Sequence, residues 1–262
     1  MKILVIHGSM RKGNTYSLTK KIMNRLLVKP DIEFIEINVS DLDLPFCCSC
    51  HVCFEKGEEF CPHYKVIHSV QSALMDCDAV IFSGTTYMWA LNASMKNLLD
   101  HLSFYFHRPA FFRKKGMVVI TSAGAGEKSV AKYLKTVLGQ WGINGAIMVT
   151  LNTKEKQLQL KREKYFDNVA ERYYKLIASK KLLTPSLRNI AVHNSFRAMS
   201  LSEFGENKRD TQYWSQAGFC DKAYPVKAGA FKYVIGSLVY GIVINMLNVI
   251  GRVYEKRLNI QK

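Results

Sequence analysis

The chain begins with the apolar run Lys2-Ile-Leu-Val-Ile-His7, which leads directly into Gly8-Ser-Met-Arg-Lys-Gly-Asn-Thr15. The run has the length and the Val and Ile content of a buried strand. The segment after it is rich in glycine and short polar side chains, and a helical pattern starts at its end. A strand, a polar loop and a helix in this order are typical of the first βα unit of a parallel sheet.

Four further apolar runs have strand length, and helical patterns separate most of them. The runs are Ile32–Asn38, Ala79–Ser83, Gly116–Thr121 and Ala146–Leu151, and the helical patterns cover Thr15–Leu27, Val66–Met75, Ser94–Phe104 and Lys128–Leu138. This alternation predicts an α/β fold with a parallel sheet and helices on both faces. Such sheets bind ligands beyond the carboxyl ends of their strands, so the loops after strands one, three and four are the ones to inspect.

Length and pattern predict one large domain with an appendage. The chain has 262 residues, and no βα unit follows Leu151. We expect a domain over residues 1–180 and a mostly helical extension over residues 181–262. Residues 154–180 read as a long charged helix whose marked face is Tyr165, Val169, Arg172, Tyr173 and Leu176. No targeting pattern precedes the first strand, which predicts a cytoplasmic protein.

Positive charge is concentrated in the second part of the chain. The net charge is +16, of which residues 1–150 carry +5 and residues 151–262 carry +11. A basic tail suggests an anionic partner, either a membrane surface or nucleic acid. A well-solvated basic surface explains the charge equally well.

The loop after the first strand has the composition of a phosphate site. Its polar members are Ser9, Arg11, Asn14 and Thr15, and its glycines are Gly8 and Gly13. Glycines allow close backbone approach, and the following helix offers unpaired N–H groups at its positive end. Capping of the helix by Asn14 or Thr15 is the simpler alternative, but it needs neither the arginine nor both glycines. The spacing matches neither a Walker loop nor a dinucleotide fingerprint.

Two later stretches belong with this loop. They are Ser83-Gly-Thr-Thr-Tyr-Met-Trp89 and Met95-Lys-Asn-Leu-Leu-Asp-His101. Together the three resemble the NADPH-dependent FMN reductase and iron–sulfur flavoprotein branch of the flavodoxin superfamily, over about residues 1–180. The family usually has proline where Thr85 stands and arginine where His101 stands.

The resemblance implies a flavodoxin-like, doubly wound, five-stranded parallel sheet of order 2-1-3-4-5, with FMN as cofactor and NAD(P)H as electron donor. It also implies a homo-oligomer, either a dimer or a tetramer. The implied FMN residues are Ser9, Arg11, Gly13, Asn14 and Thr15 around the phosphate, and Thr85, Thr86, Tyr87, Met88, Trp89, Ser122 and Gly124 along the ring. Because FMN performs the hydride chemistry, we assign no catalytic side chain. Tyr87 and Trp89 could instead be ordinary core or interface aromatics.

Five cysteines fall within fifteen residues of one another. Cys47, Cys50, Cys53 and Cys61 resemble the compact cluster motif of iron–sulfur flavoproteins and predict ligands of a 4Fe–4S cluster. Zinc and metal-free, redox-active thiols are the alternatives. Cys48 reads as a bystander, and Cys77 and Cys220 as lone buried cysteines. We interpret His51, His63 and His68 as surface or packing residues.

The C-terminal extension contains Tyr233–Ile250, eighteen residues without a charge and with lysines and arginines on both sides. Three interpretations compete. We favour a helix buried against the core or a partner subunit, ahead of a helix lying in a membrane interface. A transmembrane span comes third, because the length barely suffices and two asparagines interrupt the run.

Together these patterns predict an FMN-dependent NAD(P)H oxidoreductase that passes electrons, through a cluster if one is bound, to a quinone, small-molecule or protein acceptor. A flavodoxin-like electron carrier that does not itself oxidise NAD(P)H is the alternative, although carriers of this fold tend to be acidic. A non-enzymatic module that binds nucleic acid or membrane through the basic tail is the third hypothesis. We expect no specific nucleic-acid partner, and the extension could add a peripheral membrane contact.

Overall fold

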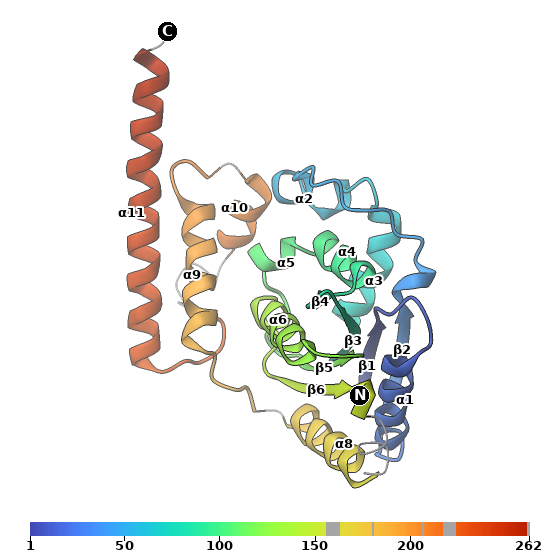
Figure 1. Ribbon diagram of the computed structural model, residues 1–262. Helices are drawn as coiled ribbons and strands as arrows, with labels where there is room; N and C mark the ends of the chain where they lie inside the picture. Colours follow the sequence, from blue (N-terminus) through green and yellow to red (C-terminus); the bar gives the residue numbers. More distant parts are fainter. Residues whose placement is uncertain (156–162, 180, 206, 217–223, 261–262) are drawn as a thin grey trace. The chain divides into compact units, whose positions relative to one another are not determined.

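The computed structural model describes residues 1–155, 163–179, 181–205, 207–216 and 224–260. The chain divides into two compact units (Figure 1). The sheet unit comprises Met1–Cys48, His63–Ser103 and Phe111–Leu182. The tail unit comprises Ser49–Pro62, Phe104–Ala110 and Leu183–Lys262, so it takes in two segments from the middle of the chain as well as the C-terminal third.

The sheet unit is built on five parallel strands. They are β1 (Lys2–His7), β2 (Glu33–Asn38), β3 (Ala79–Tyr87), β5 (Lys115–Ser122) and β6 (Ala146–Asn152). Their order is β2-β1-β3-β5-β6, and the two-residue β4 (Ala90–Leu91) pairs antiparallel with the end of β3. Among the parallel strands this is the order 2-1-3-4-5, which confirms the predicted flavodoxin-like topology.

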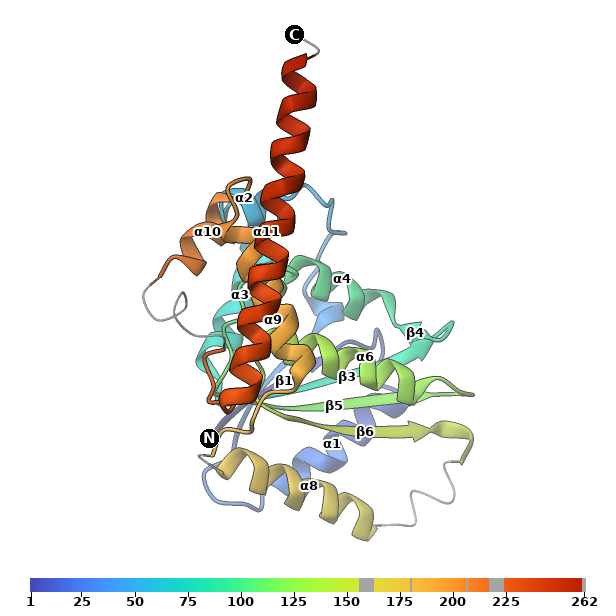
Figure 2. The same ribbon diagram turned by 90° about the vertical axis from the view of Figure 1, so that its left-hand side faces the viewer.

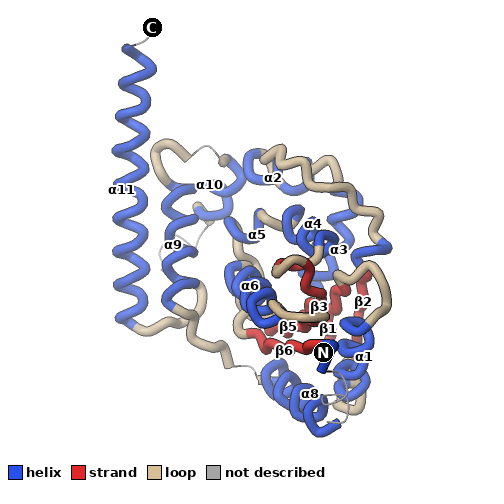
Figure 3. Tube along the Cα trace, in the orientation of Figure 1, coloured by secondary structure: helices blue, strands red, loops and turns tan. Residues whose placement is uncertain are grey.

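Uninterrupted apolar residues along the central strands give the sheet two apolar faces. Ile3 and Val5 pack in one buried cluster with α1 (Asn14–Leu26) and α8 (Glu163–Ala178). Successive side chains of a strand point to opposite faces, so Leu4 and Ile6 lie on the other face of the sheet. Helices α3 (Tyr64–Asp76), α4 (Ala93–His101) and α6 (Glu127–Gln140) cover that side (Figures 2 and 3).

The helix predicted over residues 154–180 is shorter than expected. Residues 153–155 form the 3₁₀ helix η3 (Thr153–Glu155), and residues 156–162 lie outside the described residues. Of the five residues that mark one face, Val169 and Tyr173 are buried and Leu176 packs against the same cluster, whereas Tyr165 and Arg172 are exposed. The phenol of Tyr173 donates a hydrogen bond of 2.9 Å to the carbonyl of Val80, which ties this helix to the sheet.

The tail unit is helical in its described residues. Its elements are α2 (Val52–Glu55), η2 (Glu58–Phe60), α5 (Phe104–His107), α9 (Leu187–Leu201), α10 (Lys208–Trp214) and α11 (Ala230–Ile260). Helices α9 and α11 lie side by side (Figures 1 and 2).

The uncharged run Tyr233–Ile250 lies within α11. By length and composition, the stretch Ala230–Lys256 could cross a membrane, and it is the one such helix among the described residues. Only 6% of its most apolar window is buried. Within the tail unit the helix is therefore largely uncovered, and burial against the core or a partner subunit stays a prediction.

Candidate functional site

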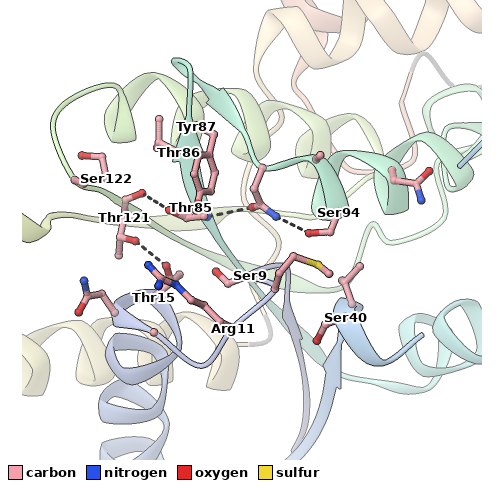
Figure 4. Close-up of a pocket in the computed structure, with 18 of the residues that line it drawn as sticks. Ser9, Arg11, Thr15, Ser40, Thr85, Thr86, Tyr87, Ser94, Thr121 and Ser122 are labelled. Atoms are coloured by element: carbon pink, nitrogen blue, oxygen red, sulfur yellow. Dashed lines mark hydrogen bonds between the residues drawn. The ribbon is translucent and has the colours of Figure 1, made fainter. Parts of the chain in front are cut away.

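A cavity of about 940 Å³ opens at the carboxyl ends of the strands in the sheet unit (Figure 4). Its walls come from the segments that follow β1, β2, β3 and β5. The volume lies within the range of small-molecule and cofactor sites. The cavity is therefore where the topology predicts a ligand.

The β1–α1 loop is held against α4 through the backbone of Gly8. A Cβ atom at this position would lie 2.6 Å from Cβ of Met95, so only glycine fits. The Gly8 N–H donates to the carbonyl of Ser83 at 2.7 Å, and the Gly8 carbonyl accepts from the Ser94 hydroxyl at 2.6 Å. The loop thus has a fixed path along one wall of the cavity.

The start of α1 is not capped by a side chain. The N-cap residue is Gly13, and the described residues place no side-chain hydrogen bond there. Instead, the Thr15 hydroxyl lies 2.6 Å from that of Thr121 at the end of β5, and Thr15 is buried. The capping alternative for Asn14 and Thr15 is therefore not what the structure contains. The positive end of the helix faces a polar cavity that both residues line.

Two hydroxyl groups in the cavity wall lack partners. Ser9 Oγ and Thr86 Oγ1 are buried, and neither has a hydrogen bond among the described residues. Leaving a buried hydroxyl unsatisfied costs about 1–3 kcal/mol, which a bound polar ligand would recover. The two groups lie in separate walls, one in the phosphate loop and one on β3 (Figure 4). A ligand with a phosphate and a polar ring, as FMN has, fits this donor set.

The end of β3 is fixed by bonds to the neighbouring wall. The amide of Thr85 donates to Asn92 Oδ1 at 3.2 Å, and its hydroxyl donates to the Thr121 carbonyl at 3.3 Å. Tyr87 lines the cavity with 62% of its surface exposed, so its ring stands at the rim. These residues present backbone and side-chain groups along one long side of the cavity.

The segment Gly84–Trp89, expected as a loop, is instead the end of a strand and a tight hairpin turn. Strand β3 continues to Tyr87, and Met88 and Trp89 form the turn with φ values of 46° and 61°. Two left-handed residues suit the twist of a two-residue hairpin, but they are costly without glycine. Such strain concentrates at functional sites.

Most of the residues predicted to hold the cofactor line the cavity, and three do not. Those that do are Ser9, Arg11, Gly13, Asn14, Thr15, Thr85, Thr86, Tyr87 and Ser122. Met88 and Trp89 are not in the lining because they occupy the turn tip, where Trp89 lies against Gly126. Gly124 is also absent from the lining, and Ala123 takes that place.

Several lining residues were missed. They include Ser40, Asp43, Asn92, Ser94, Asn97 and Thr121. The signals were present, because Ser40 and Asp43 follow the second strand and Asn92 stands just before the predicted helix. The sequence could not show that this asparagine turns its side chain toward β3 instead of capping α4.

His7 at the end of β1 lies beneath the phosphate loop. Its Nδ1 lies 3.1 Å from Ser83 Oγ, and its Nε2 lies 3.1 Å from Glu36 Oε2. Burial lowers the pKa of His7 although Glu36 opposes the shift. Burial alone would raise the pKa of Glu36, but hydrogen bonds from Lys20 and His7 leave it lowered. The strand end thus carries a neutral histidine against a carboxylate.

His101, which stands where the family usually has arginine, pairs with another histidine. Its Nδ1 donates to the Asn97 carbonyl at 2.9 Å, so its Nε2 accepts from Nδ1 of His63 at 2.9 Å when the ring is neutral. Burial lowers the pKa of His101 and favours that neutral state. In this arrangement His63 packs against the ring of His101.

The predicted cluster ligands are divided between the two units. Cys47 belongs to the sheet unit, where its N–H donates to Asn97 Oδ1 at 3.0 Å, whereas Cys50, Cys53 and Cys61 belong to the tail unit. Among the described residues, no three His, Cys, Asp or Glu side chains converge as metal ligands do. The cluster ligand set therefore stays a prediction. Cys77 is buried as expected, and Cys220 lies outside the described residues.

Within the tail unit, a buried ion pair fixes the segment that carries Cys53. The Arg108 guanidinium bonds the fully buried carboxylate of Asp210 and also donates to Glu58 at 2.8 Å and to the Cys53 carbonyl at 3.0 Å. His107 Nδ1 lies 2.8 Å from the same Asp210 carboxylate.

We call the group Glu58, His107, Arg108 and Asp210 the Arg108 hub. Aromatic contacts of His107 add to its hydrogen bonds. The His107 ring lies 4.4 Å from the rings of both Phe54 and Phe196. Trp214 Nε1 donates to the His107 carbonyl at 3.1 Å. The tail stretch Asp210–Trp214 therefore serves to hold the cysteine-bearing segment against α5.

Comparisons with known proteins agree with this geometry. The family model of NADPH-dependent FMN reductases matches residues 1–153. An iron–sulfur flavoprotein of Archaeoglobus fulgidus is 26% identical over 227 residues, which cover 84% of this chain and all of that one. An iron–sulfur flavoprotein of Clostridioides difficile is 25% identical, covering 83% of this chain and 99% of its own.

Solved structures share the fold at lower identity. The apo form of an NADH:FMN oxidoreductase superposes with a TM-score of 0.53 at 18% identity, covering 68% of this chain and 90% of that one. An azoreductase of Bacillus anthracis gives 0.52 at 16% identity, covering 67% and 98%. These likenesses show the flavodoxin-like fold of the sheet unit.

Proposed function

The chain belongs to the NADPH-dependent FMN reductase family, and we propose that it is an FMN-dependent NAD(P)H oxidoreductase whose electrons pass to a quinone or another small or protein acceptor. The hydroxyls of Ser9 and Thr86 in the cavity, which have no hydrogen-bond partner in the described part of the chain, carry the proposal. They are groups that the folded chain leaves for a polar cofactor.

The phosphate loop binds the phosphate end of the cofactor. The Ser9 hydroxyl donates to it, the N–H groups at the start of α1 face it, and Arg11 supplies the positive charge in the cavity wall. Asp43 is the acidic residue of that wall. The remaining polar lining is neutral, which suits a phosphate paired with one arginine.

The β3 and β5 ends position the ring. The Thr86 hydroxyl is available to the polar edge of the ring, and Tyr87 at the rim covers it from solvent. The Ser122 hydroxyl donates to Glu127 Oε2 at 2.6 Å, which fixes the opposite wall. When bound, FMN accepts hydride from the reduced nicotinamide and passes electrons onward. The side chains bind and orient, and none is needed as an acid or base.

The direct test removes the phosphate contacts. We expect the double variant Arg11→Ala, Thr15→Ala to bind FMN at least about tenfold more weakly, because each charge-assisted or buried hydrogen bond contributes about 1–3 kcal/mol. Flavin fluorescence titration measures the affinity, and circular dichroism checks the fold. Arg113→Ala, at an exposed arginine away from the cavity, is the matched control. Equal FMN affinity in the double variant contradicts the phosphate assignment.

Steady-state oxidation separates the enzyme from the electron carrier. The purified flavoprotein should oxidise NADH or NADPH with a quinone present. A carrier would hold FMN but oxidise neither nicotinamide rapidly.

The iron–sulfur cluster and the oligomer belong to the same proposal. The relatives named iron–sulfur flavoproteins support a 4Fe–4S cluster on Cys47, Cys50, Cys53 and Cys61. Protein purified without oxygen should then contain about four irons and as much acid-labile sulfide per chain. We also propose a cytoplasmic dimer or tetramer, which sedimentation velocity would detect.

A further inference from the structure

Helix α11 carries a continuous apolar face that the described residues leave uncovered. Its exposed large apolar side chains are Phe231, Val234, Leu238, Ile242, Met246, Val249, Ile250, Val253 and Tyr254. They recur mostly at intervals of three and four residues, so they lie along one side of the helix. Monomeric soluble proteins rarely leave an apolar strip of this length to water.

The opposite side of α11 is already occupied by α9 and the turn after it. The Arg197 guanidinium lies 4.5 Å from the centre of the Tyr240 ring. Asn248 Oδ1 accepts from the N–H of Glu203 at 3.0 Å. Gly251 has no side chain, and the Phe204 ring fills the place that a Cβ would take. The helix therefore has one side anchored on α9 and an apolar side that stays open.

This anchoring argues against a transmembrane span. Glu203 pairs with Arg252 at 2.7 Å, and Arg197 lies on the adjoining helix. If α11 crossed a bilayer, the helix packed along it would bring these charges into the hydrocarbon, at a cost of several kcal/mol. If the helix lies in the plane of the membrane interface, these charged side chains stay on the side that faces water.

The charges around the apolar face favour an anionic surface. From Lys222 to Tyr254 there is no Asp or Glu and there are four lysines and arginines, of which Arg252 pairs with Glu203; Glu255 follows. Lys227 before the helix and Lys256 near its end are exposed. A second copy laid on the same face would bring like charges together at the helix ends in either orientation, which opposes self-association.

We propose that α11 docks the protein on an anionic lipid surface, with its apolar face at the level of the headgroups and its basic ends on lipid phosphates. Apolar burial and charge act together in such helices. The inference concerns the tail unit alone and does not depend on the flavin.

Vesicle co-sedimentation of the full-length protein tests it. We expect binding to vesicles of equal parts phosphatidylglycerol and phosphatidylcholine, and little binding to phosphatidylcholine alone. Val234→Glu should abolish the binding, and Val28→Glu, at an exposed valine of the sheet unit, is the matched control. The pair Lys227→Gln, Lys256→Gln should bind about 30-fold more weakly, since each basic residue near an anionic surface contributes roughly fivefold.

Two further measurements distinguish the other occupants. Circular dichroism with a thermal melt verifies that each variant folds. If Val234→Glu dissociates an oligomer in lipid-free solution, a second copy covers the face and the proposal is wrong. If alkaline carbonate fails to release the bound protein and only detergent does, the helix spans the bilayer, which also overturns it. Equal sedimentation of Val234→Glu and Val28→Glu contradicts it directly.

Discussion

Different kinds of interaction stabilise the interior of the sheet unit and the interior of the tail unit. The sheet unit has an apolar interior in which β1, β5 and the first six residues of β3 are almost wholly buried between helices. In the tail unit, the connection between α2, α5 and α10 is a buried ion pair, the Arg108 hub. The first depends on a repeated apolar pattern, and the second depends on a few particular side chains from three distant segments.

This difference predicts different responses to substitution. When a side chain in an apolar core is shortened, the protein loses the burial energy of the removed atoms. A cavity adds to this loss, and neighbouring side chains limit it by partly closing the gap. A buried ion pair loses more when one member is deleted, because the other remains charged and desolvated.

The largest effect should come from Asp210→Ala in the Arg108 hub. Removing a buried carboxylate from beneath Arg108 should lower the free energy of unfolding of the tail unit by about 3–5 kcal/mol. Hydrogen exchange with mass spectrometry measures protection in the two units separately. Glu203→Ala, which deletes the exposed partner of Arg252, is the matched control and should cost about 1 kcal/mol or less. Similar losses in the two variants would remove the distinction.

A smaller effect is expected in the sheet. Leu4 on β1 is fully buried and pairs in register with Ile35 and Val80. Leu4→Ala should lower the free energy of unfolding by about 2–4 kcal/mol through lost burial and a residual cavity. Urea denaturation gives the value, and Leu27→Ala, at a leucine more than half exposed, should change it little. A loss no larger than that of Leu27→Ala would contradict the assignment of Leu4 to the sheet core.

The smallest effect is a pH dependence in the tail unit. Burial, with a further contribution from Arg197, lowers the pKa of His193 to about 3. The unfolded chain therefore binds a proton below pH 6.5 that the folded chain does not, so stability falls on acidification at about 1.4 kcal/mol per pH unit. From pH 6.5 to pH 5 the loss is about 1.6 kcal/mol.

His193→Gln isolates this contribution, since His7 and His101 act in the same direction. Urea denaturation at several pH values should give a slope smaller by nearly one proton than that of the unsubstituted protein. An unchanged slope would mean that His193 titrates alike in both states.

The sequence by itself determined the sheet and most of the phosphate loop. Buried strands need apolar residues on both faces, and Ile3–Ile6 show them without interruption, so local pattern and global fold agree. The role of the glycine at position 8 and of the polar residues after it could also be predicted, because the loop after the first parallel strand lies at the carboxyl end of the sheet, where ligands bind.

Only the tertiary structure showed which side chains stabilise the tail unit and where the turn after β3 lies. Asp210 reads as a surface acid in a short polar stretch, and nothing local shows that Arg108, a hundred residues earlier, lies beside it. Met88 and Trp89 adopt left-handed backbone that their residue types disfavour, because the strand pairing overrides local preference. Contacts between distant segments leave no periodic pattern in the sequence, and for that reason they could be identified only in the tertiary structure.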